Sequence, residues 1–201
     1  FYMKNKLVII TSIINPIKEP LSYTNVRTIY SSEERFEQVL KTINSVKEKI
    51  PNSLIVLLEC SSNIEQYEDI LRNKVDKYFN YINNTTVLKH VNSKFKSMGE
   101  NYQMLNFLIN ENLKDYESII KISGRYYLNN NFNYSIFDND ENIFRYYKSV
   151  DVVSTRLYKI GKQYFKHYID TLKSADKYLK QGASIEQVLT KLLIMTRIDY
   201  I

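Results

Sequence analysis

The first part of the chain carries two kinds of apolar pattern. Residues 6–12 (KLVIITS) form a short apolar run that ends in small hydroxyl residues, which is typical of a strand buried on both faces. A helix should begin near residue 31, because Ser31 and Glu34 fit a capping box and apolar residues then recur at helical spacing. Residues 53–59 (SLIVLLE) form a second apolar run. This order predicts two parallel strands joined by a right-handed helical crossover.

The rest of the chain has weaker and more varied signals. Pro16 and Pro20 predict a loop over residues 15–30. The further elements that the spacing predicts are a short helix at 64–73, strands at 78–82 and 87–90, a helix at 99–113, a central strand at 118–122, a strand at 150–155, and helices at 163–180 and 185–197 around a break at 181–183.

These elements predict an α/β fold. We expect a Rossmann-like, mostly parallel central sheet flanked by helices, with a helical C-terminal segment over about residues 162–201. The chain has no internal repeat and no low-complexity linker, so residues 1–201 should form a single domain. A chain of 201 residues can bury most of the surface that its unfolded form exposes.

Composition and charge indicate which partners and which cellular compartment to expect, and say less about the reaction. The net charge of +6 comes from lysines spread along the chain, which argues against a nucleic-acid partner. A single cysteine, Cys60, excludes a disulfide framework and fits the cytosol. No apolar run approaches the roughly 20 residues of a membrane-spanning helix. We therefore expect a cytoplasmic protein, either free or peripheral at the membrane face, and the sequence does not predict its oligomeric state.

Polar residues follow each predicted strand of the sheet. They are Thr11 and Ser12, residues 59–62, residues 123–127, and residues 155–156. In an open α/β sheet, ligands bind beyond the carboxyl ends of the strands, so these residues should converge on one site. Glu59 is either an acceptor for a ribose or a base edge, or a solvated strand end.

The segment before the helix at 99–113 is basic. Lys94, Lys96 and Ser97 come directly before a helix amino terminus, where free backbone N–H groups favour an anion such as a diphosphate. The alternative is a surface loop in which Ser97 and Glu100 form a second capping box.

The segment KISGRYY, residues 121–127, leaves the predicted central strand. Gly124 allows a ligand to approach the backbone closely, and the planar guanidinium of Arg125 can neutralise phosphate charge. The alternative is a glycine turn in which Arg125 pairs with a nearby carboxylate. Tyr126 and Tyr127 follow directly and can stack on a sugar or a base.

Two further acidic positions are candidates for chemistry. Glu186 lies in the first turn of a helix capped by Ser184 and Gln187, where it either stabilises the helix or acts as the general base toward an acceptor hydroxyl. Asp138 and Asp140 form an Asp-x-Asp sequence in a polar stretch, which is either a turn or a site for Mg²⁺ or Mn²⁺.

Together, several motifs resemble a group of glycosyltransferase-like proteins from bacterial polysaccharide clusters and large DNA viruses. The motifs are YSSEERFEQ (30–38), TINS (42–45), the strand ending in Glu59, KSMGE (96–100) and KISGRYYL (121–128), and the similarity covers about residues 5–195. The resemblance implies a GT-A-like fold and hexosyl transfer from a nucleotide-diphosphate sugar, as substrate, to a glycan or lipid-linked acceptor in polysaccharide biosynthesis.

The same resemblance assigns roles to residues. It places Arg35 in a Glu-Arg element, Lys96, Gly99 and Glu100 in a phosphate-proximal loop, and Lys121, Ser123, Gly124 and Arg125 at the donor. Glycosyltransferases of this fold usually carry two metal-binding aspartates where this chain has Ser-Gly-Arg. That departure puts a requirement for Mn²⁺ or Mg²⁺ in doubt, and it leaves a non-catalytic module that binds sugar nucleotides or glycans as the alternative to a transferase with Glu186 and Arg125 as its catalytic residues.

Overall fold

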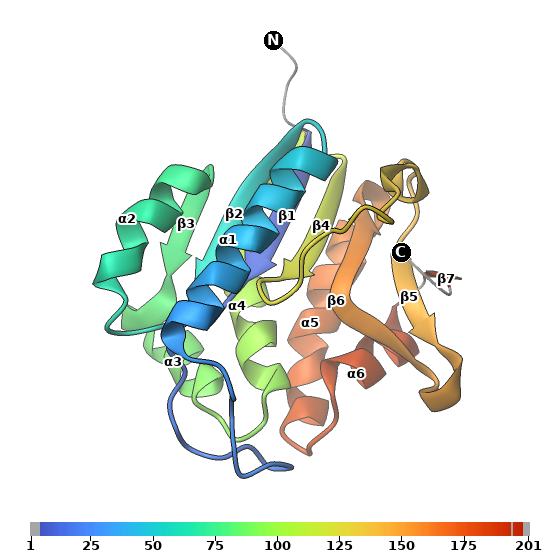
Figure 1. Ribbon diagram of the computed structural model, residues 1–201. Helices are drawn as coiled ribbons and strands as arrows, with labels where there is room; N and C mark the ends of the chain where they lie inside the picture. The colour runs from blue at the N-terminus through green and yellow to red at the C-terminus, as the bar shows by residue number, and fades with distance from the viewer. Residues whose placement is uncertain (1–4, 194, 199–201) are drawn as a thin grey trace.

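The computed structural model describes residues 5–193 and 195–198 (Figure 1). The strands are β1 (Lys6–Thr11), β2 (Ser53–Glu59), β3 (Lys77–Asn80), β4 (Ser118–Ser123), β5 (Ile143–Tyr147), β6 (Val152–Gly161) and β7 (Thr196–Ile198). The helices are α1 (Ser32–Lys49), α2 (Glu65–Lys74), α3 (Thr85–Val91), α4 (Ser97–Asn110), α5 (Phe165–Leu179) and α6 (Ile185–Leu192). Short 3₁₀ turns lie at Tyr81–Asn83, Leu113–Asp115, Tyr134–Phe137, Lys148–Val150 and Lys162–Tyr164.

The described strands form one seven-stranded sheet in the order β3-β2-β1-β4-β6-β5-β7. Strands β3, β2, β1 and β4 are parallel to one another. Strand β6 runs antiparallel to both β4 and β5, and β7 pairs parallel with β5. The carboxyl ends of β1, β2 and β4 therefore lie at one edge of the sheet, which is the lower edge in Figure 1.

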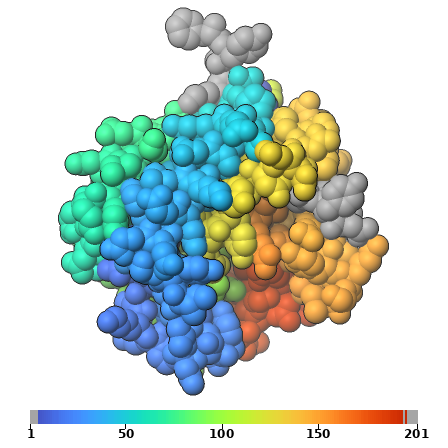
Figure 2. All heavy atoms as spheres, in the orientation of Figure 1, coloured from blue at the N-terminus to red at the C-terminus, as the bar shows by residue number. Residues whose placement is uncertain are grey.

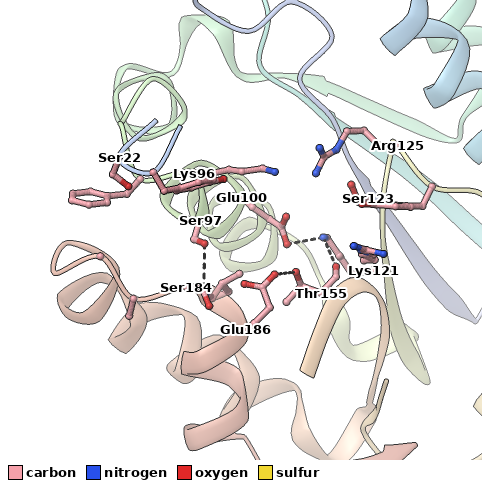
Figure 3. A pocket seen from close by; sticks show the side chains of 17 residues that line it. Ser22, Lys96, Ser97, Glu100, Lys121, Ser123, Arg125, Thr155, Ser184 and Glu186 are labelled. Atoms are coloured by element: carbon pink, nitrogen blue, oxygen red, sulfur yellow. Dashed lines mark hydrogen bonds and ion pairs between the residues drawn. The ribbon is translucent and has the colours of Figure 1, made fainter. Parts of the chain in front are cut away.

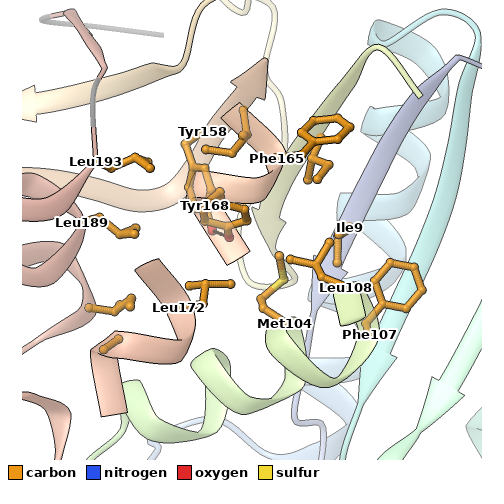
Figure 4. Packing of buried hydrophobic residues seen from close by; sticks show 14 of the residues in the cluster. Ile9, Met104, Phe107, Leu108, Tyr158, Phe165, Tyr168, Leu172, Leu189 and Leu193 are labelled. Atoms are coloured by element: carbon orange, nitrogen blue, oxygen red, sulfur yellow. Dashed lines mark hydrogen bonds between the residues drawn. The ribbon is translucent and has the colours of Figure 1, made fainter. Parts of the chain in front are cut away.

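Both faces of the sheet are covered by helices. Alternate residues of β1 enter two separate cores, with Leu7 and Ile9 on one side and Val8 and Ile10 on the other. Helix α1, in front of the sheet in Figure 1, packs with α2 on the second of these faces. Helices α4, α5 and α6 cover the opposite face, where their apolar residues pack together (Figure 4). The α/β fold class and the mostly parallel sheet predicted above are confirmed.

The strongest local signals predicted their elements closely. The α1 capping box is present, since the Ser31 hydroxyl accepts from the Glu34 N–H and the Glu34 carboxylate accepts from the Ser31 N–H. Strand β2 coincides with the second apolar run, and the first helical prediction after it differs from α2 by one residue at each end. Glycine 182 ends the α5 segment in a left-handed conformation, with φ of 92°, at the predicted break.

The prediction of a strand at 87–90 is wrong. This segment is α3, whose amino end is capped by the Asn84 side chain accepting from the Val87 N–H at 3.0 Å. Val87 and Val91, four residues apart, are buried on the same side of the helix. In so short an apolar segment, helical and strand spacing cannot be told apart without the cap.

The antiparallel side of the sheet was not predicted correctly. Strand β5 was missed, and the strand expected at 150–155 is the much longer β6, which runs from Val152 to Gly161. The helix expected at 185–197 ends at Leu192, and β7 follows it. Residues 194 and 199–201 of the predicted helical segment lie outside the described part. Among the described residues, no helix combines the length and apolar character needed to cross a bilayer.

Candidate functional site

A cavity of about 370 Å³ opens at the carboxyl edge of the sheet. Its walls come from residues in the stretches 22–23, 95–100, 121–126, 155–156 and 182–186. A smaller hollow of about 80 Å³, lined by Thr11, Ser12 and Arg35, adjoins it and shares Lys96 and Arg125 with it. In Figure 2 the blue N-terminal loop, the yellow segment after β4 and the orange-red C-terminal part meet around this region.

Three cationic side chains reach this cavity. Lys96, Arg125 and Arg156 line it, and none of their charged groups makes a hydrogen bond or ion pair with another described residue. The guanidinium carbons of Arg125 and Arg156 lie 5.8 and 4.8 Å from the centre of the Tyr126 ring. Partial burial lowers the pKa of Lys96, and the nearby charge of Arg125 lowers it further. The cavity thus concentrates positive charge that the chain does not neutralise.

Arg35 adds a fourth cation beside the smaller hollow. Its Nε donates to the Ile13 carbonyl at 2.8 Å, while its Nη1 is buried without a hydrogen-bond partner. Burial lowers the pKa of Arg35 to about 10, and repulsion from Arg125 contributes to the shift. A buried guanidinium nitrogen without a partner is suited to an acceptor oxygen on a ligand.

A buried ion pair also lines the cavity. The Lys121 side chain has no exposed surface; its Nζ donates to Glu100 Oε1 at 2.6 Å and to the Thr155 carbonyl at 2.8 Å (Figure 3). This contact joins α4, β4 and β6. The charge of Lys121 is therefore compensated within the protein, in contrast to those of Lys96 and Arg125.

Glu186 projects from the first turn of α6 into the same cavity. Its Oε1 accepts a hydrogen bond from the Thr155 hydroxyl at 2.6 Å (Figure 3). The capping box of Ser184 and Gln187 predicted for α6 is present. The Ile185 N–H also donates to the Ser97 hydroxyl at 3.2 Å, which ties the start of α6 to the start of α4. The carboxylate of Glu186 is thus held in place on the side of the cavity facing Lys96.

The capping box of Ser97 and Glu100, given above as the alternative for this helix start, does not form. The N-cap position is Lys96, and no side chain caps the helix there. The Ser97 hydroxyl binds Ile185 instead, and the Glu100 carboxylate binds Lys121. The Ser97 hydroxyl and the Glu100 carboxylate therefore bind residues that are distant in sequence, and the local spacing of residues does not predict such contacts.

Gly99 is buried in α4 and does not line the cavity. A Cβ added there would lie 2.9 Å from the Cα of Val91, so glycine is needed for the close packing of α3 on α4.

Gly124 also allows a close contact between two segments, at the start of the loop after β4. Its N–H donates to the Thr11 carbonyl at 2.9 Å, and an added Cβ would lie 3.1 Å from Val39, which lets the loop after β4 lie on the end of β1.

Glu59 is enclosed at the end of β2 and has no exposed surface. Its Oε1 accepts from the Ile14 N–H at 3.0 Å, the Cys60 N–H at 2.9 Å and the Ser61 hydroxyl at 2.5 Å. Burial raises the pKa of Glu59. The side chain therefore fixes the loops that follow β1 and β2, and it is neither a solvated strand end nor a group in the cavity wall.

Two other groups of predicted residues lie away from the cavity. Tyr127 is half exposed, and its ring faces the ammonium of Lys41 at 3.7 Å. Asp138 and Asp140 lie near Gly161, which pairs with Ser118 at the amino end of β4 and so at the opposite edge of the sheet. Within the described ranges, no three His, Cys, Asp or Glu side chains gather as a metal site would need.

Some cavity residues had no clear signal in the sequence. The sequence predicts Thr155 and Arg156 at a strand end but assigns them no role. They lie at the carboxyl edge of β4 because β6 runs antiparallel to β4 and Leu157 pairs with Ile122. Gln103 was missed, although a polar residue on the buried face of α4 is a usable signal; its Nε2 donates to the Ser12 carbonyl at 3.1 Å.

The loop between β1 and α1 forms one rim of the cavity. The Arg27 guanidinium donates to the Val91 and Ser93 carbonyls at 3.0 and 2.8 Å, so it caps the carboxyl end of α3 and tethers the loop. The loop then exposes four large side chains, in fractions of 69%, 56%, 83% and 42%, at Tyr23, Val26, Ile29 and Tyr30. Of these four side chains, Tyr23 also lines the cavity.

Comparison with known proteins identifies the fold. No protein-family model and no curated protein sequence matches the chain. A galactosyltransferase, LgtC, solved with donor and acceptor sugar analogues, aligns at a TM-score of 0.53 and 11% identity over 92% of this chain and 70% of its own. A protein from Desulfovibrio desulfuricans G20 named as a nucleotide-diphospho-sugar transferase aligns at 0.53 and 6% identity, over 98% and 80%.

A third structure is a 4-diphosphocytidyl-2C-methyl-D-erythritol synthase from Anaerococcus prevotii. It aligns at a TM-score of 0.50 and 12% identity, over 96% of this chain and 86% of its own. Identities this low show a shared fold and not a shared activity. The chain has a GT-A-like fold, of the kind found in nucleotide-sugar transferases.

Proposed function

We propose that this protein is a glycosyltransferase that moves a sugar from a nucleotide-diphosphate sugar to a glycan or lipid-linked acceptor. The observation that carries the proposal is the pairing of opposite charges across one cavity. Among the described residues, Lys96, Arg125 and Arg156 are cations without hydrogen-bond or ion-pair partners. Glu186 is a positioned carboxylate, and all four lie at the edge of a GT-A-like sheet where ligands bind. The cations suit a diphosphate, and the carboxylate suits a proton acceptor.

The reaction follows from these two charges. The acceptor hydroxyl attacks the anomeric carbon of the donor sugar and its proton passes to Glu186. The bond between the anomeric carbon and the diphosphate oxygen breaks, and the electron pair leaves with the diphosphate, which gains one negative charge. Arg125 and Lys96 stabilise that charge as it forms. The Thr155 hydroxyl, at 2.6 Å from Glu186 Oε1, keeps the base oriented.

The hollow next to the cavity suits the rest of the donor. Thr11, Ser12 and the Arg35 guanidinium offer hydroxyls and a free N–H to the nucleoside. In this scheme Ser123 and the Tyr126 ring lie beside the sugar or the diphosphate. The exposed Tyr23 ring at the cavity, on a loop that also exposes Val26 and Ile29, supports a glycan or lipid-linked acceptor, because sugar faces and lipid chains both pack on such side chains.

A nucleotidyltransferase is the main alternative enzyme class, since one structure of similar fold is the 4-diphosphocytidyl-2C-methyl-D-erythritol synthase described above. Such an enzyme would use a glycine-rich loop after the first strand to hold phosphates. Here the N–H groups of Ser12, Ile14 and Asn15 donate to Leu58, Glu59 and Ser61 within the protein. These backbone groups are not free for phosphate, which favours sugar transfer.

The test combines a donor panel with one variant. Uridine, guanosine and thymidine diphosphate sugars are added in a thermal-shift assay, and donor turnover is followed with the donor that binds. We expect the Glu186→Gln variant to keep the thermal shift and to lose turnover by about 10²–10⁴-fold, the usual contribution of a general base. Glu65→Gln is the matched control, because Glu65 lies in the first turn of α2 and is exposed away from the cavity.

Two results would contradict the proposal. No thermal shift with any nucleotide sugar would exclude a donor site. Binding without turnover in the unmodified protein, across acceptors that include a sugar and a lipid-linked sugar, would instead identify the non-catalytic binding module.

A further inference from the structure

We infer that the donor diphosphate is bound without a divalent cation, and that Arg156 joins Arg125 and Lys96 in holding it. This inference rests on the proposed function and concerns how the same site neutralises its substrate. It also gives a role to Arg156, whose strand position did not suggest one.

The cavity offers few of the oxygen ligands that a divalent cation needs. Mg²⁺ and Mn²⁺ prefer carboxylates and other hard oxygen donors. Of the two carboxylates that line the cavity, Glu100 is bound to the Lys121 ammonium at 2.6 Å and Glu186 to the Thr155 hydroxyl at 2.6 Å. A metal ion at Glu100 would have to share this carboxylate with the buried ammonium of Lys121.

The position that carries acidic residues in metal-dependent enzymes of this fold is also unsuited. It holds Ser123, Gly124 and Arg125, and the Asp138–Asp140 pair lies across the sheet, near Gly161. A divalent cation at the end of β4 would lie among the charges of Lys96, Arg125 and Arg156 and would be repelled by them. The residues present therefore do not fit the metal.

The same cations fit a diphosphate directly. The guanidinium carbons of Arg125 and Arg156 lie 5.8 and 4.8 Å from the centre of the Tyr126 ring, and neither guanidinium has a hydrogen-bond or ion-pair partner among the described residues. Each can present two parallel N–H groups to phosphate oxygens. The repulsion between Arg125 and Lys96 that lowers the lysine pKa in the free protein is relieved when an anion lies between them.

The experiment measures binding and needs no acceptor. UDP, GDP and dTDP are titrated into the protein by calorimetry, once in excess EDTA and once in excess Mn²⁺. We expect the nucleoside diphosphate that binds to have the same Kd in both buffers to within about threefold. Arg125→Ala and Arg156→Ala should each raise that Kd about 10–100-fold, since each removes charged hydrogen bonds.

The matched control is Arg145→Ala. Arg145 is an exposed arginine on β5 whose guanidinium carbon lies 5.0 Å from the centre of the Tyr147 ring, so it repeats the arginine–tyrosine contact outside the cavity. We expect this variant to bind like the unmodified protein. Circular dichroism of all three variants checks that they are folded.

The outcomes separate the two proposals. Binding in Mn²⁺ but not in EDTA overturns the metal-free site and leaves the proposed function standing. Binding in both buffers with Arg156→Ala equal to Arg145→Ala removes Arg156 from the site. Failure of all three nucleotides in both buffers overturns the proposed function together with this inference.

Discussion

Lys121 shows how one buried side chain can organise the wall of a cavity. The sequence places a lysine in the middle of an apolar strand, and a donor-binding role was the natural prediction. In the structure its ammonium is enclosed and satisfied by Glu100 and the Thr155 carbonyl. Its function is therefore to hold α4 and β6 at fixed positions on either side of β4.

Replacing Lys121 by methionine should destabilise the protein by about 2–3 kcal/mol, because it leaves a carboxylate and a buried carbonyl without their charged donor. Urea unfolding followed by circular dichroism measures the free energy of unfolding. Lys47→Met, at an exposed position on α1, is the control and should change it little. Equal losses in the two variants would show that the Lys121 contact does not stabilise the fold.

The candidate site was predictable where charge and strand position coincide. Lys96, Arg125 and Glu186 were predicted because each stands at the start of a helix or the end of a strand, and all three line the cavity. Glu59 and Gly99 occur in equally suggestive positions but serve the core. Whether a side chain at a strand end turns inward or outward depends on long-range packing, and a single sequence does not contain that information.

At the scale of elements, α1 and α4 differ in what fixes their first turn. Helix α1 begins with a complete capping box made by residues three apart, so its start was predictable. Helix α4 has no side-chain cap, and its first turn is held by Lys121 and Ile185. Strands β5 and β6 resemble α4 in this respect. Their antiparallel pairing depends on contacts between segments distant in sequence, which the local apolar pattern does not predict.

Gly99→Ala should weaken the contact between α3 and α4. The new methyl group would lie 2.9 Å from the Val91 backbone, and overpacking of this kind costs about 1–3 kcal/mol. We expect a lower urea midpoint and an undiminished thermal shift with the nucleotide that binds. Asn110→Ala, at an exposed position on the same helix, is the control. A lost thermal shift in a stable Gly99→Ala protein would restore the ligand-contact role predicted from the sequence.

At the scale of the whole molecule, the α/β class was predictable and the strand order was not. Buried strands separated by amphipathic helices lead to a parallel sheet with both faces covered, by general rules of chain connection. Strand β6 lies between β4 and β5. At its end, Gly161 passes close to the Asp140 backbone, and a Cβ added to Gly161 would lie 1.8 Å from the Asp140 carbonyl oxygen. That contact is 21 residues apart in sequence and has no local signature.

The pH dependence of global stability should have a maximum in the alkaline range. Burial lowers the pKa of Lys159 to about 8, below its value in the unfolded chain, so the unfolded state holds more protons above that pH and stability rises. Burial raises the pKa of Tyr116 to about 12, so above about pH 10 the folded state holds more protons and stability falls.

Urea unfolding at intervals from pH 7 to about 11 tests this prediction. The rise between about pH 8 and 9.5 should be smaller in Lys159→Met than in the unmodified protein, while Lys47→Met should keep it. An unchanged rise in Lys159→Met would assign it to another group.

The residues that position Glu186 are synthesised in a fixed order. The carboxylate depends on Thr155 and the α6 start depends on Ser97, and both partners are synthesised earlier than α6 itself. A ribosome therefore delivers the cations Lys96 and Arg125 well before Glu186, whose carboxylate lines the same cavity. During synthesis the cationic side chains of the cavity therefore precede α6, the last of the described helices.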